Sequence, residues 1–392
     1  MPVVTVYYDR MFSMLKGKIS KDQLIEKIPY LGLDIEEEND EYIKIEYNPN
    51  RPDYSTDYGI ARSLNSFLDF ETEYSEYHIN ESEFVINVDK STEQVRQYIV
   101  AAVIKDVKLD DETIRQVITM QEDLHNGIGR RRKKVAIGIH NLNVIKSPLE
   151  YITVDDSFSF IPLNKDSDMT VKAILNSEIG NQYADILSGH NRYPIIRDAN
   201  KQVLSFPPII NGDLTRLDSK TTNLFIDVTG TDLDAVSNAL SVLFTTLNDA
   251  GGKVHSVEIN VDSSKIKTPE INDDTMEVDT EYVRSLLGLE ISEKEIIEYL
   301  RRCRILGEIS GNKVVIKTEP FRFDLIHPVD VIEEIGLGYG IHNLEPTLPG
   351  SDMTGGFDEK QRFLDKARDV LTGLGSVSYT HLRAHETLRY LV

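Results

Sequence analysis

Two stretches far apart in the chain share one pattern of apolar and polar positions. Residues 15–28 (LKGKISKDQLIEKI) and 287–300 (LGLEISEKEIIEYL) each place a serine before a polar turn and then repeat apolar residues at helical spacing. A serine at that position accepts hydrogen bonds from the free N–H groups of the first turn, so each stretch predicts a capped helix. Paired positions lie 271 or 272 residues apart.

The same offset relates two alternating stretches that end in Pro-x-Arg-x-Asp. They are residues 42–53 (YIKIEYNPNRPD) and 313–324 (KVVIKTEPFRFD), and a helical pattern follows each, at 58–68 and 329–340. Alternation of apolar and polar residues predicts a strand with one buried face. The sequence therefore predicts a duplicated module of two helices, a strand pair and a third helix, winged-helix-like in outline.

The region between the copies has a different pattern. A continuous apolar run at 97–107 predicts a buried strand, 110–129 predicts a helix closed by Asn-Gly, and 223–261 predicts a strand, a helix and a strand. Polar, turn-rich stretches at 71–82, 263–275 and 345–356 are interpreted as linkers. The expected fold class is α+β multidomain, with winged-helix-like modules at 1–75 and 270–345 flanking an α/β domain at 83–262, and a further piece at 356–374.

Composition narrows the class of protein. The 392 residues are 40% hydrophobic and carry a formal net charge of −22, which is typical of a globular chain and argues against a protein that simply coats nucleic acid. A single cysteine, Cys303, excludes an internal disulfide framework, and no apolar run approaches the ~18 residues of a membrane span. The first residues lack a secretory signal pattern, so a soluble cytoplasmic protein with no membrane partner is expected.

Four carboxylates gather where the third helix of the second copy begins. They are Asp324, Asp330, Glu333 and Glu334. If Pro328 is the first helical position, the last three lie on one helix face, which predicts either a solvated acidic face or a site for a hard cation such as Mg2+. The first copy has Gly59, Arg62 and Ser63 at the matching positions, so the module folds without these acids and a cation or partner site is favoured.

Polar residues beside an irregular strand end are candidates for a binding or reaction site. The two prolines at 207–208 interrupt strand pairing. They leave Ser205 and Asn211 on an irregular rim, where polar side chains commonly serve ligands. Asp227 and Thr229 alternate onto one face of a later strand end. Turn chemistry and helix capping are the alternative explanation of these residues.

Motifs for common catalytic chemistry are absent from the sequence. There is no phosphate-binding G-x-x-x-x-G-K-[ST], no nucleophile elbow G-x-S-x-G and no Cys/His metal spacing. His140 alternates with apolar strand positions and is interpreted as a structural or surface residue. The basic run at 129–134 (GRRRKK) is either a solvated turn or a phosphate contact for nucleic acid.

Three segments, at 47–64, 203–232 and 320–340, together resemble the beta subunit of the archaeal and eukaryotic type of phenylalanine–tRNA ligase. The resemblance extends over about residues 1–374. It implies an α2β2 heterotetramer, an aminoacyl-tRNA ligase that joins phenylalanine to tRNA(Phe) with ATP. The aminoacylation site, with its ATP and phenylalanine, would lie on the alpha subunit, which accounts for the missing ATP motif.

The resemblance also implies that the domain at 83–262 is an editing domain that hydrolyses tyrosine wrongly attached to tRNA(Phe). Its candidate residues are Ser205, Asn211, Asp227 and Thr229, with Ile195 or Ile196 and Pro207 as walls. On the same resemblance Mg2+, shared with the alpha subunit, is assigned to Asp324, Asp330, Glu333 and Glu334.

The C-terminal part departs from the family pattern. Residues 356–374 match the start of a large domain that resembles an inactive synthetase core, but 375–392 fit neither that domain nor a helix cap and resemble a translated adapter sequence. A truncated or mis-joined gene with a non-native tail is therefore expected. Two other classes stay open: a non-catalytic module that binds nucleic acid or a partner, and a free-standing Mg2+-dependent hydrolase that uses the acids at 324–334.

Overall fold

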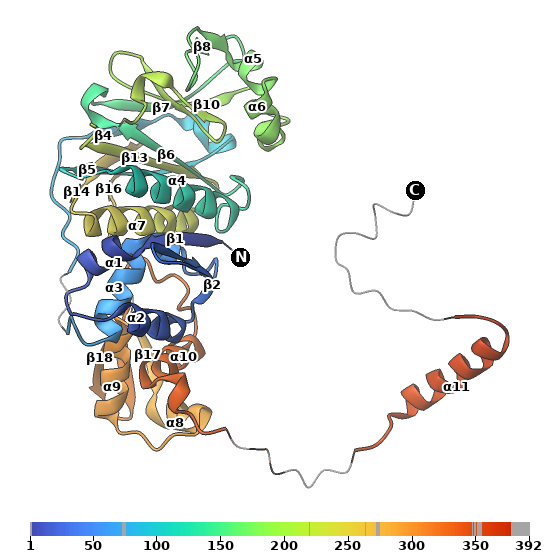
Figure 1. Ribbon diagram of the computed structural model, residues 1–392. Coiled ribbons are helices and arrows are strands. Elements are labelled where there is room, and N and C mark those ends of the chain that lie inside the picture. Colours follow the sequence, from blue (N-terminus) through green and yellow to red (C-terminus); the bar gives the residue numbers. More distant parts are fainter. Residues whose placement is uncertain are drawn as a thin grey trace. The chain divides into compact units, whose positions relative to one another are not determined.

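The computed structural model describes residues 2–72, 76–218, 220–262, 264–271, 275–346, 348, 350 and 355–377. It divides into two compact units, Met1–Leu344 and Glu345–Val392, and each is treated by itself. The first unit is a mixed α+β fold with several sheets (Figure 1). Among the described residues no helix combines the length and apolarity needed to cross a membrane.

The first copy of the repeat forms a small antiparallel sheet packed against helices. In chain order its elements are β1 (Val3–Tyr7), α1 (Tyr8–Met14), α2 (Lys21–Lys27), β2 (Asp34–Glu38), β3 (Tyr42–Glu46) and α3 (Asp57–Phe67). The strand order is β1-β3-β2. Ser20 caps α2 as predicted, because its side chain accepts from the Gln23 N–H while the Gln23 side chain accepts from the Ser20 N–H.

The second copy repeats this order of elements. They are β17 (Thr275–Asp279), α8 (Thr280–Leu287), α9 (Glu293–Arg302), β18 (Leu306–Ser310), β19 (Lys313–Lys317) and α10 (Pro328–Tyr339), with strand order β17-β19-β18. Ser292 forms the predicted cap at α9, and α10 begins at Pro328 as predicted. The leading strands β1 and β17 are not predicted, because VVTVY is apolar at almost every position and TMEVD has only two apolar residues, so neither shows a clear alternation.

The Pro-x-Arg-x-Asp motifs of the two copies meet at one buried seam. Each arginine holds its own aspartate by two hydrogen bonds, Arg51 to Asp53 at 2.9 and 2.9 Å and Arg322 to Asp324 at 2.9 and 2.8 Å. Glu334 on α10 accepts from Arg322 at 2.7 Å and lies 3.9 Å from Arg51 of the other copy. Alternating guanidinium and carboxylate groups therefore join the copies.

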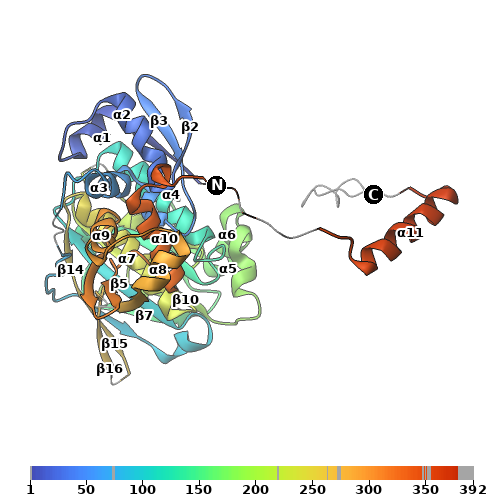
Figure 2. The same ribbon diagram turned by 90° about the horizontal axis from the view of Figure 1, so that it is seen from below.

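Arg62 extends this seam to the middle of the chain. Its guanidinium donates to Asp53 at 3.3 Å and to Asp249, the last residue of α7 (Leu233–Asp249), at 2.6 Å. Figure 2 shows α3 of the first copy beside α9 of the second, and there the Ser66 hydroxyl donates to the Arg301 carbonyl at 2.8 Å. Helix α3 thus links the first copy to both other parts of the unit, through Arg62 to α7 and through Ser66 to the second copy.

Two sheets pack face to face in the middle of the chain. The first has the antiparallel order β14-β5-β13-β6, from β5 (Tyr98–Lys105), β6 (Val135–Asn141), β13 (Leu224–Gly230) and β14 (Lys253–His255). Helices α4 (Asp111–Asn126) and α7 cover one face of it (Figure 1). On that face Val100, Ile137 and Val228 are buried with apolar residues of both helices.

The second sheet covers the opposite face. Its order is β12-β11-β10-β7-β4-β15-β16. The strands are β4 (Val85–Val88), β7 (Leu149–Val154), β10 (Tyr193–Arg197), β11 (Val203–Phe206), β12 (Ile210–Asn211), β15 (Val257–Val261) and β16 (Ser264–Thr268). Ile99 and Phe225 of the first sheet are buried with Tyr151 and Ile196 of the second. Strand β16 lies in the stretch at 263–275 that the sequence predicts to be a linker. Its sequence shows no apolar alternation, since four of its five side chains are exposed.

A smaller lobe adjoins the edge of the second sheet. It contains β8 (Ser159–Phe160), β9 (Met169–Thr170), α5 (Val171–Leu175) and α6 (Glu178–Tyr183). Its apolar side chains Phe160 and Val171 are buried together with Ile195 and Phe206 of the sheet. The lobe and the sheet edge therefore share one core.

The described part of the second unit contains helix α11 (Glu359–Gly373). Asp358 caps it by accepting from the Gln361 N–H. The tail expected at 375–392 lies outside the described residues from 378 onward.

The charge state of Asp53 ties the stability of the seam to pH. Asp53 is 0% exposed, and burial alone would raise its pKa, but the charges of Arg51, Arg62 and Arg322 lower that pKa below its ordinary value. A depressed pKa adds stability that is present above the unfolded value, near pH ~4, and is lost as the pH falls through the folded value. The ion pairs of Asp53 therefore stabilise the fold at neutral pH and weaken in acid.

We expect Asp53→Asn to lower the free energy of unfolding at pH 7 by about 3–5 kcal/mol, because it leaves buried guanidinium groups without their carboxylate. Urea unfolding followed by circular dichroism at pH 7 and pH 3 measures the effect. The difference from wild type should shrink at pH 3. Asp34→Asn, on the exposed surface of β2, is the control and should change neither curve. A difference of the same size at both pH values would contradict the expectation.

Candidate functional site

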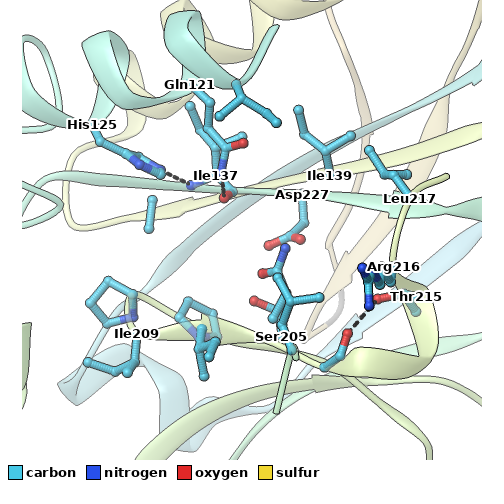
Figure 3. A pocket seen from close by; sticks show the side chains of 18 of the residues that line it. Gln121, His125, Ile137, Ile139, Ser205, Ile209, Thr215, Arg216, Leu217 and Asp227 are labelled. Carbon is cyan, nitrogen blue, oxygen red and sulfur yellow. Dashed lines mark hydrogen bonds between the residues drawn. The ribbon is translucent and has the colours of Figure 1, made fainter. Parts of the chain in front are cut away.

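A cavity of about 500 Å³ lies beside β6, the edge strand of the first sheet (Figure 3). Apolar residues of α4 and β6 form one wall, and β11, β12 and the loop that follows them form the other. A largely apolar lining with a few polar side chains is typical of a small-molecule pocket. The polar lining residues are Gln121, Glu122, His125, Arg132, Asn164, Ser205, Asn211, Thr215, Arg216 and Asp227.

Three of the four predicted editing residues line this pocket. Ser205 on β11 is the antiparallel partner of Asn211 on β12, so the two lie next to each other on one wall. Asp227 comes from β13 in the other sheet and points toward the wall that carries Ser205 (Figure 3). Side chains from both sheets therefore face the same space.

The fourth predicted residue, Thr229, lies behind the pocket. It is 0% exposed, and its hydroxyl accepts from Nε of Arg96 at 3.0 Å. Of the predicted walls, Pro207 lines the cavity. Ile195 and Ile196 are buried in two separate apolar clusters and do not belong to the described lining.

Asp227 is paired with a histidine that the sequence does not link to it. Nε2 of His140 lies 2.8 Å from Oδ2 of Asp227, and Nδ1 lies 2.7 Å from Oγ1 of Thr215. All three residues of this bridge are buried, with His140 at 0% and Asp227 and Thr215 each at 1% exposure. The bridge connects the first sheet to the loop that follows Asn211.

Charged and polar groups close the opposite end of the pocket. Arg132 donates to Glu122 at 2.8 Å and to the carbonyls of Pro208 and Ile209, each at 3.3 Å. His125 accepts from the Ile137 N–H through Nε2, so Nδ1 donates to Glu122. The hydrogen bond from His125 and the charge of Arg132 lower the pKa of Glu122 to about 2, against the opposing effect of burial. Burial in turn lowers the pKa of His125.

The basic turn at 129–134 reaches this rim with an unusual backbone. The backbone φ angles of Arg130, Arg131 and Arg132 are 47°, 55° and 64°. These values lie in the left-handed region, which residues other than glycine rarely adopt. Arg96 supports the turn, since its NH1 donates to the carbonyls of Arg132 and Lys133 at 3.2 and 3.3 Å. Its NH2 donates to the Thr229 carbonyl at 2.7 Å.

Arg96 is itself an unusual buried cation. It is 1% exposed, and within the described part of the chain no ion pair joins it to a carboxylate. Burial lowers its pKa to about 10. Its hydrogen bonds all go to backbone carbonyls and one hydroxyl. Arg96 therefore ties the basic turn to the end of the strand that carries Asp227.

The four carboxylates of the second copy have different surroundings. Asp324 and Glu334 are held by Arg322, with side-chain exposures of 8% and 10%. Oδ2 of Asp330 accepts from the backbone N–H groups of Ile326 and His327 at 2.8 and 2.7 Å, which fixes the start of α10. Glu333 is exposed. Among the described residues no group of three or more such side chains is placed to hold a metal ion.

Sequence reasoning missed Arg96 and Thr215 as functional candidates and interpreted His140 as a structural or surface residue, whereas Arg132 lies in the basic run at 129–134 that it had singled out. Arg96 and Thr229 are 133 positions apart, and His140 and Asp227 are 87 positions apart. Their meeting depends on which strands pair. The only local signal is the glycine at 138, two residues before His140 and opposite Asp227 in the sheet.

Comparison with known proteins first indicates the class of protein. A family model described as tRNA synthetase B5 domain matches residues 276–341, nearly the whole second copy. The second copy is thus a module of the tRNA synthetases, which indicates the class of ligases that serve protein biosynthesis.

Longer relatives then define the family. The phenylalanine–tRNA ligase beta subunit of Archaeoglobus fulgidus is 41% identical over 376 residues, 96% of this chain and 68% of that protein. That of Methanosphaera stadtmanae is 38% identical over 388 residues, 98% of this chain and 69% of that protein. The chain belongs to the family of phenylalanine–tRNA ligase beta subunits, which implies an alpha subunit as its partner.

A solved structure agrees with this assignment. The crystal structure of an N-terminal fragment of the phenylalanyl-tRNA synthetase beta subunit from Pyrococcus horikoshii matches with a TM-score of 0.81 and 33% identity. The match covers 86% of this chain and 99% of that fragment. The mixed α+β multidomain fold is therefore shared.

We expect Arg96→Lys to loosen the basic turn, because lysine lacks the planar fork that donates to several carbonyls at once. Hydrogen exchange measured by mass spectrometry should accelerate about 10-fold over residues 129–135, as the loss of a hydrogen bond or two implies, and stay unchanged in α7.

Arg192→Lys provides a matched control. Arg192 also donates through Nε and NH2 to a threonine, the hydroxyl and carbonyl of Thr153, but does not line the pocket. It should leave exchange at 129–135 unchanged. Equal acceleration in both variants, or none in Arg96→Lys, would contradict a specific support of the turn.

Proposed function

We propose that the pocket hydrolyses tyrosine from mischarged Tyr-tRNA(Phe), so that this subunit edits while the alpha subunit uses ATP to join phenylalanine to tRNA(Phe). The observation that carries the proposal is the convergence of Ser205, Asn211 and Asp227 from two sheets on one largely apolar pocket. The need for such an editing step comes from the ligation reaction, which must select phenylalanine over tyrosine. An apolar site cannot strongly reject a side chain that only adds a hydroxyl, with ~10²-fold as a representative limit.

The buried carboxylate of Asp227 offers the selectivity that such a first site lacks. A phenol donates its O–H to the carboxylate, whereas a phenyl ring leaves a desolvated acceptor without a donor. A site built on this hydrogen bond can reject the analogue that lacks the hydroxyl by 10⁴-fold or more, on the order of what hydroxyl-reading sites achieve. Asp227 is therefore assigned to tyrosine recognition.

Ser205 and Asn211 are assigned to the ester itself. Their hydroxyl and amide groups can hold a water molecule and the ester carbonyl close together, which favours attack by proximity and orientation. The water oxygen bonds to the carbonyl carbon, the bond to the ribose oxygen breaks, and that oxygen leaves with a proton from the water. Thr229 does not face the substrate. Its hydroxyl accepts from Arg96 and so helps to hold the strand end that carries Asp227.

The basic turn supports delivery of a tRNA end to the pocket. Arg130, Arg131 and Lys133 are exposed, while Arg132 between them reaches the rim of the cavity. Cations placed this way can contact phosphates of the acceptor end, even though the whole chain is acidic. We favour the phosphate contact over a merely solvated turn for this reason.

We also propose the domain division 1–75, 83–262 and 270–345, with winged-helix-like modules on either side of the editing domain. The matching strand orders β1-β3-β2 and β17-β19-β18 support the first and third modules. The cytoplasm, where charged tRNA is used, is the proposed place of action.

For Mg2+ the residues present do not form a complete site. Asp324 and Glu334 already bind Arg322, and one oxygen of Asp330 is used by two backbone N–H groups. We propose that a Mg2+ ion shared with the alpha subunit would be held here by Glu333 and the remaining oxygen of Asp330. Mg2+ is often held by one or two carboxylates together with water, which fits this smaller set.

We expect the alanine double variant Asp227→Ala, Thr229→Ala to lose at least about 100-fold in hydrolysis of Tyr-tRNA(Phe), because it removes the acceptor for the phenol and its support. Release of tyrosine is measured with the purified chain, alone and with the alpha subunit, and Phe-tRNA(Phe) is the comparison substrate. Asp234→Ala, an exposed acid in the first turn of α7, should behave as wild type. Full activity of the double variant would refute the assignment, and tRNA binding without hydrolysis by wild type would favour a non-catalytic module.

For the metal, we expect Glu333→Gln to weaken Mg2+ binding by the assembled complex at least about 10-fold, as loss of one of two carboxylate ligands implies. Its melting temperature in the absence of Mg2+ should stay unchanged. Glu334→Gln should instead lower the melting temperature, because it unbalances Arg322. Isothermal titration with Mg2+ and thermal unfolding measure the two effects, with exposed Glu308→Gln as control. Equal Mg2+ affinity of Glu333→Gln and wild type would rule out this site.

A further inference from the structure

His140 is a buried imidazole whose place in the sheet needs an explanation beyond packing. Its ring lies against Phe225, with ring centroids 6.2 Å apart, and both of its nitrogens are engaged. A histidine that served only to fill the core would leave polar atoms to be satisfied there, at a cost that an apolar residue avoids. Its two hydrogen bonds point instead to the pocket residue Asp227 and to Thr215.

The strand register explains how His140 reaches Asp227. In the β6–β13 pair Asp227 is opposite Gly138 and Phe225 is opposite His140, so Asp227 and His140 are diagonal neighbours on one sheet face. Gly138 leaves the space between them open. A Cβ atom at position 138 would lie 2.1 Å from Oδ2 of Asp227 and 2.5 Å from Nε2 of His140. The glycine is therefore a condition for the hydrogen bond.

Hydrogen-bond chemistry fixes the direction of the bond to Asp227. A carboxylate only accepts, so Nε2 of His140 carries a proton and donates to Oδ2 of Asp227. The hydroxyl of Thr215 both donates and accepts, so it serves Nδ1 in either state of the ring, and it also lies 3.4 Å from the Gly212 carbonyl. Thr215, His140 and Asp227 therefore form one connected row of polar groups. Thr215 sits in the short helical turn Asp213–Thr215, which directly follows the strand that carries Asn211.

This arrangement leaves one oxygen of Asp227 for a ligand. His140 occupies Oδ2, and no hydrogen bond joins Oδ1 to any residue in the described parts of the chain. Rotation of the carboxylate about its Cβ–Cγ bond would otherwise exchange the two oxygens. A donor fixed on one of them sets the direction in which the other accepts.

We propose that His140 is a positioning residue of the deacylation site, which holds the Asp227 carboxylate so that its free oxygen accepts the phenol O–H of a misplaced tyrosine. This inference rests on the proposed editing function and adds a residue to it. His140 itself touches neither the substrate nor the reacting ester, since it lies behind Asp227 and does not belong to the pocket lining among the described residues. Thr215 assists by holding the other nitrogen of the ring.

The experiment compares variants that break the bond with one that restores a donor. His140→Phe keeps an aromatic ring but removes both hydrogen bonds, whereas His140→Gln keeps an N–H donor of similar reach. We expect His140→Phe to lower kcat for hydrolysis of Tyr-tRNA(Phe) about 10- to 100-fold, the scale of a hydrogen bond to a charged group. KM should stay unchanged, because contacts with the tRNA body are not affected. His140→Gln should recover most of the rate.

A double-variant test separates positioning from general damage to the fold. In the Asp227→Ala background, His140→Phe should cause no further loss, because the group that it positions is gone. A full additional loss there, wild-type kcat in His140→Phe, or a Gln variant as slow as the Phe variant would overturn the proposal. If His140→Phe does not fold, Thr215→Val and Gly138→Ala test the same bridge from its two sides and should each lower kcat.

A spectroscopic readout distinguishes this inference from the proposed function. In the wild-type chain with 15N-labelled histidine, the Nε2 proton of His140 should exchange slowly and give a resolved NMR signal that disappears in Asp227→Ala. If wild type hydrolyses Tyr-tRNA(Phe) but the signal and the kcat effect are both missing, only the role of His140 fails. If wild type shows the signal but no hydrolysis, the editing function fails, and the positioning role fails with it.

Discussion

The fold depends on a buried row of guanidinium and carboxylate groups where the two copies of the repeat meet. A carboxylate as deeply buried as Asp53, at 0% exposure, is stable only if cations surround it. The first copy places this acid between Arg51 and Arg62, and so has a surplus of positive charge. The second copy places Arg322 between two acids and has a surplus of negative charge. Each copy compensates the other, so neither is electrically complete alone.

This complementarity changes what the comparison of the copies means. Three of the acids at 324–334, Asp330, Glu333 and Glu334, are missing from the first copy, which in the sequence suggests a role outside the fold. In the structure Glu334 binds Arg322 and faces Arg51 of the other copy. In the first copy the third helix instead provides a cation, Arg62, which binds Asp53. Duplicated modules that pack against each other must diverge where they touch, since identical charges would repel. Absence from one copy is thus compatible with a structural role in the other.

Local features were predictable from the sequence and non-local ones were not. The caps at Ser20 and Ser292 and the start of α10 at Pro328 depend on a few neighbouring residues, and the structure contains all of them. The shared face of Asp227 and Thr229 follows from strand alternation, but alternation cannot tell which of them meets a cavity. Arg96 covers Thr229, and that contact joins residues 133 positions apart. Three of the four candidates named from the sequence therefore line the pocket, while the contacts that support them could not be predicted.

Two carboxylates of almost equal burial differ in how far the fold itself satisfies them. Asp53 is 0% exposed and accepts hydrogen bonds on both oxygens, from Arg51 and Arg62. Asp227 is 1% exposed and, among the described residues, accepts only from His140. Leaving acceptor capacity unused in a desolvated place costs stability, so an unused oxygen that faces a cavity calls for a donor from outside the fold. Burial alone does not distinguish the two acids, whereas the unused oxygen facing a cavity does. By that measure the proposed editing chemistry belongs to the pocket that Asp227 lines, while Asp53 at the seam has its acceptors filled by arginines of the fold itself.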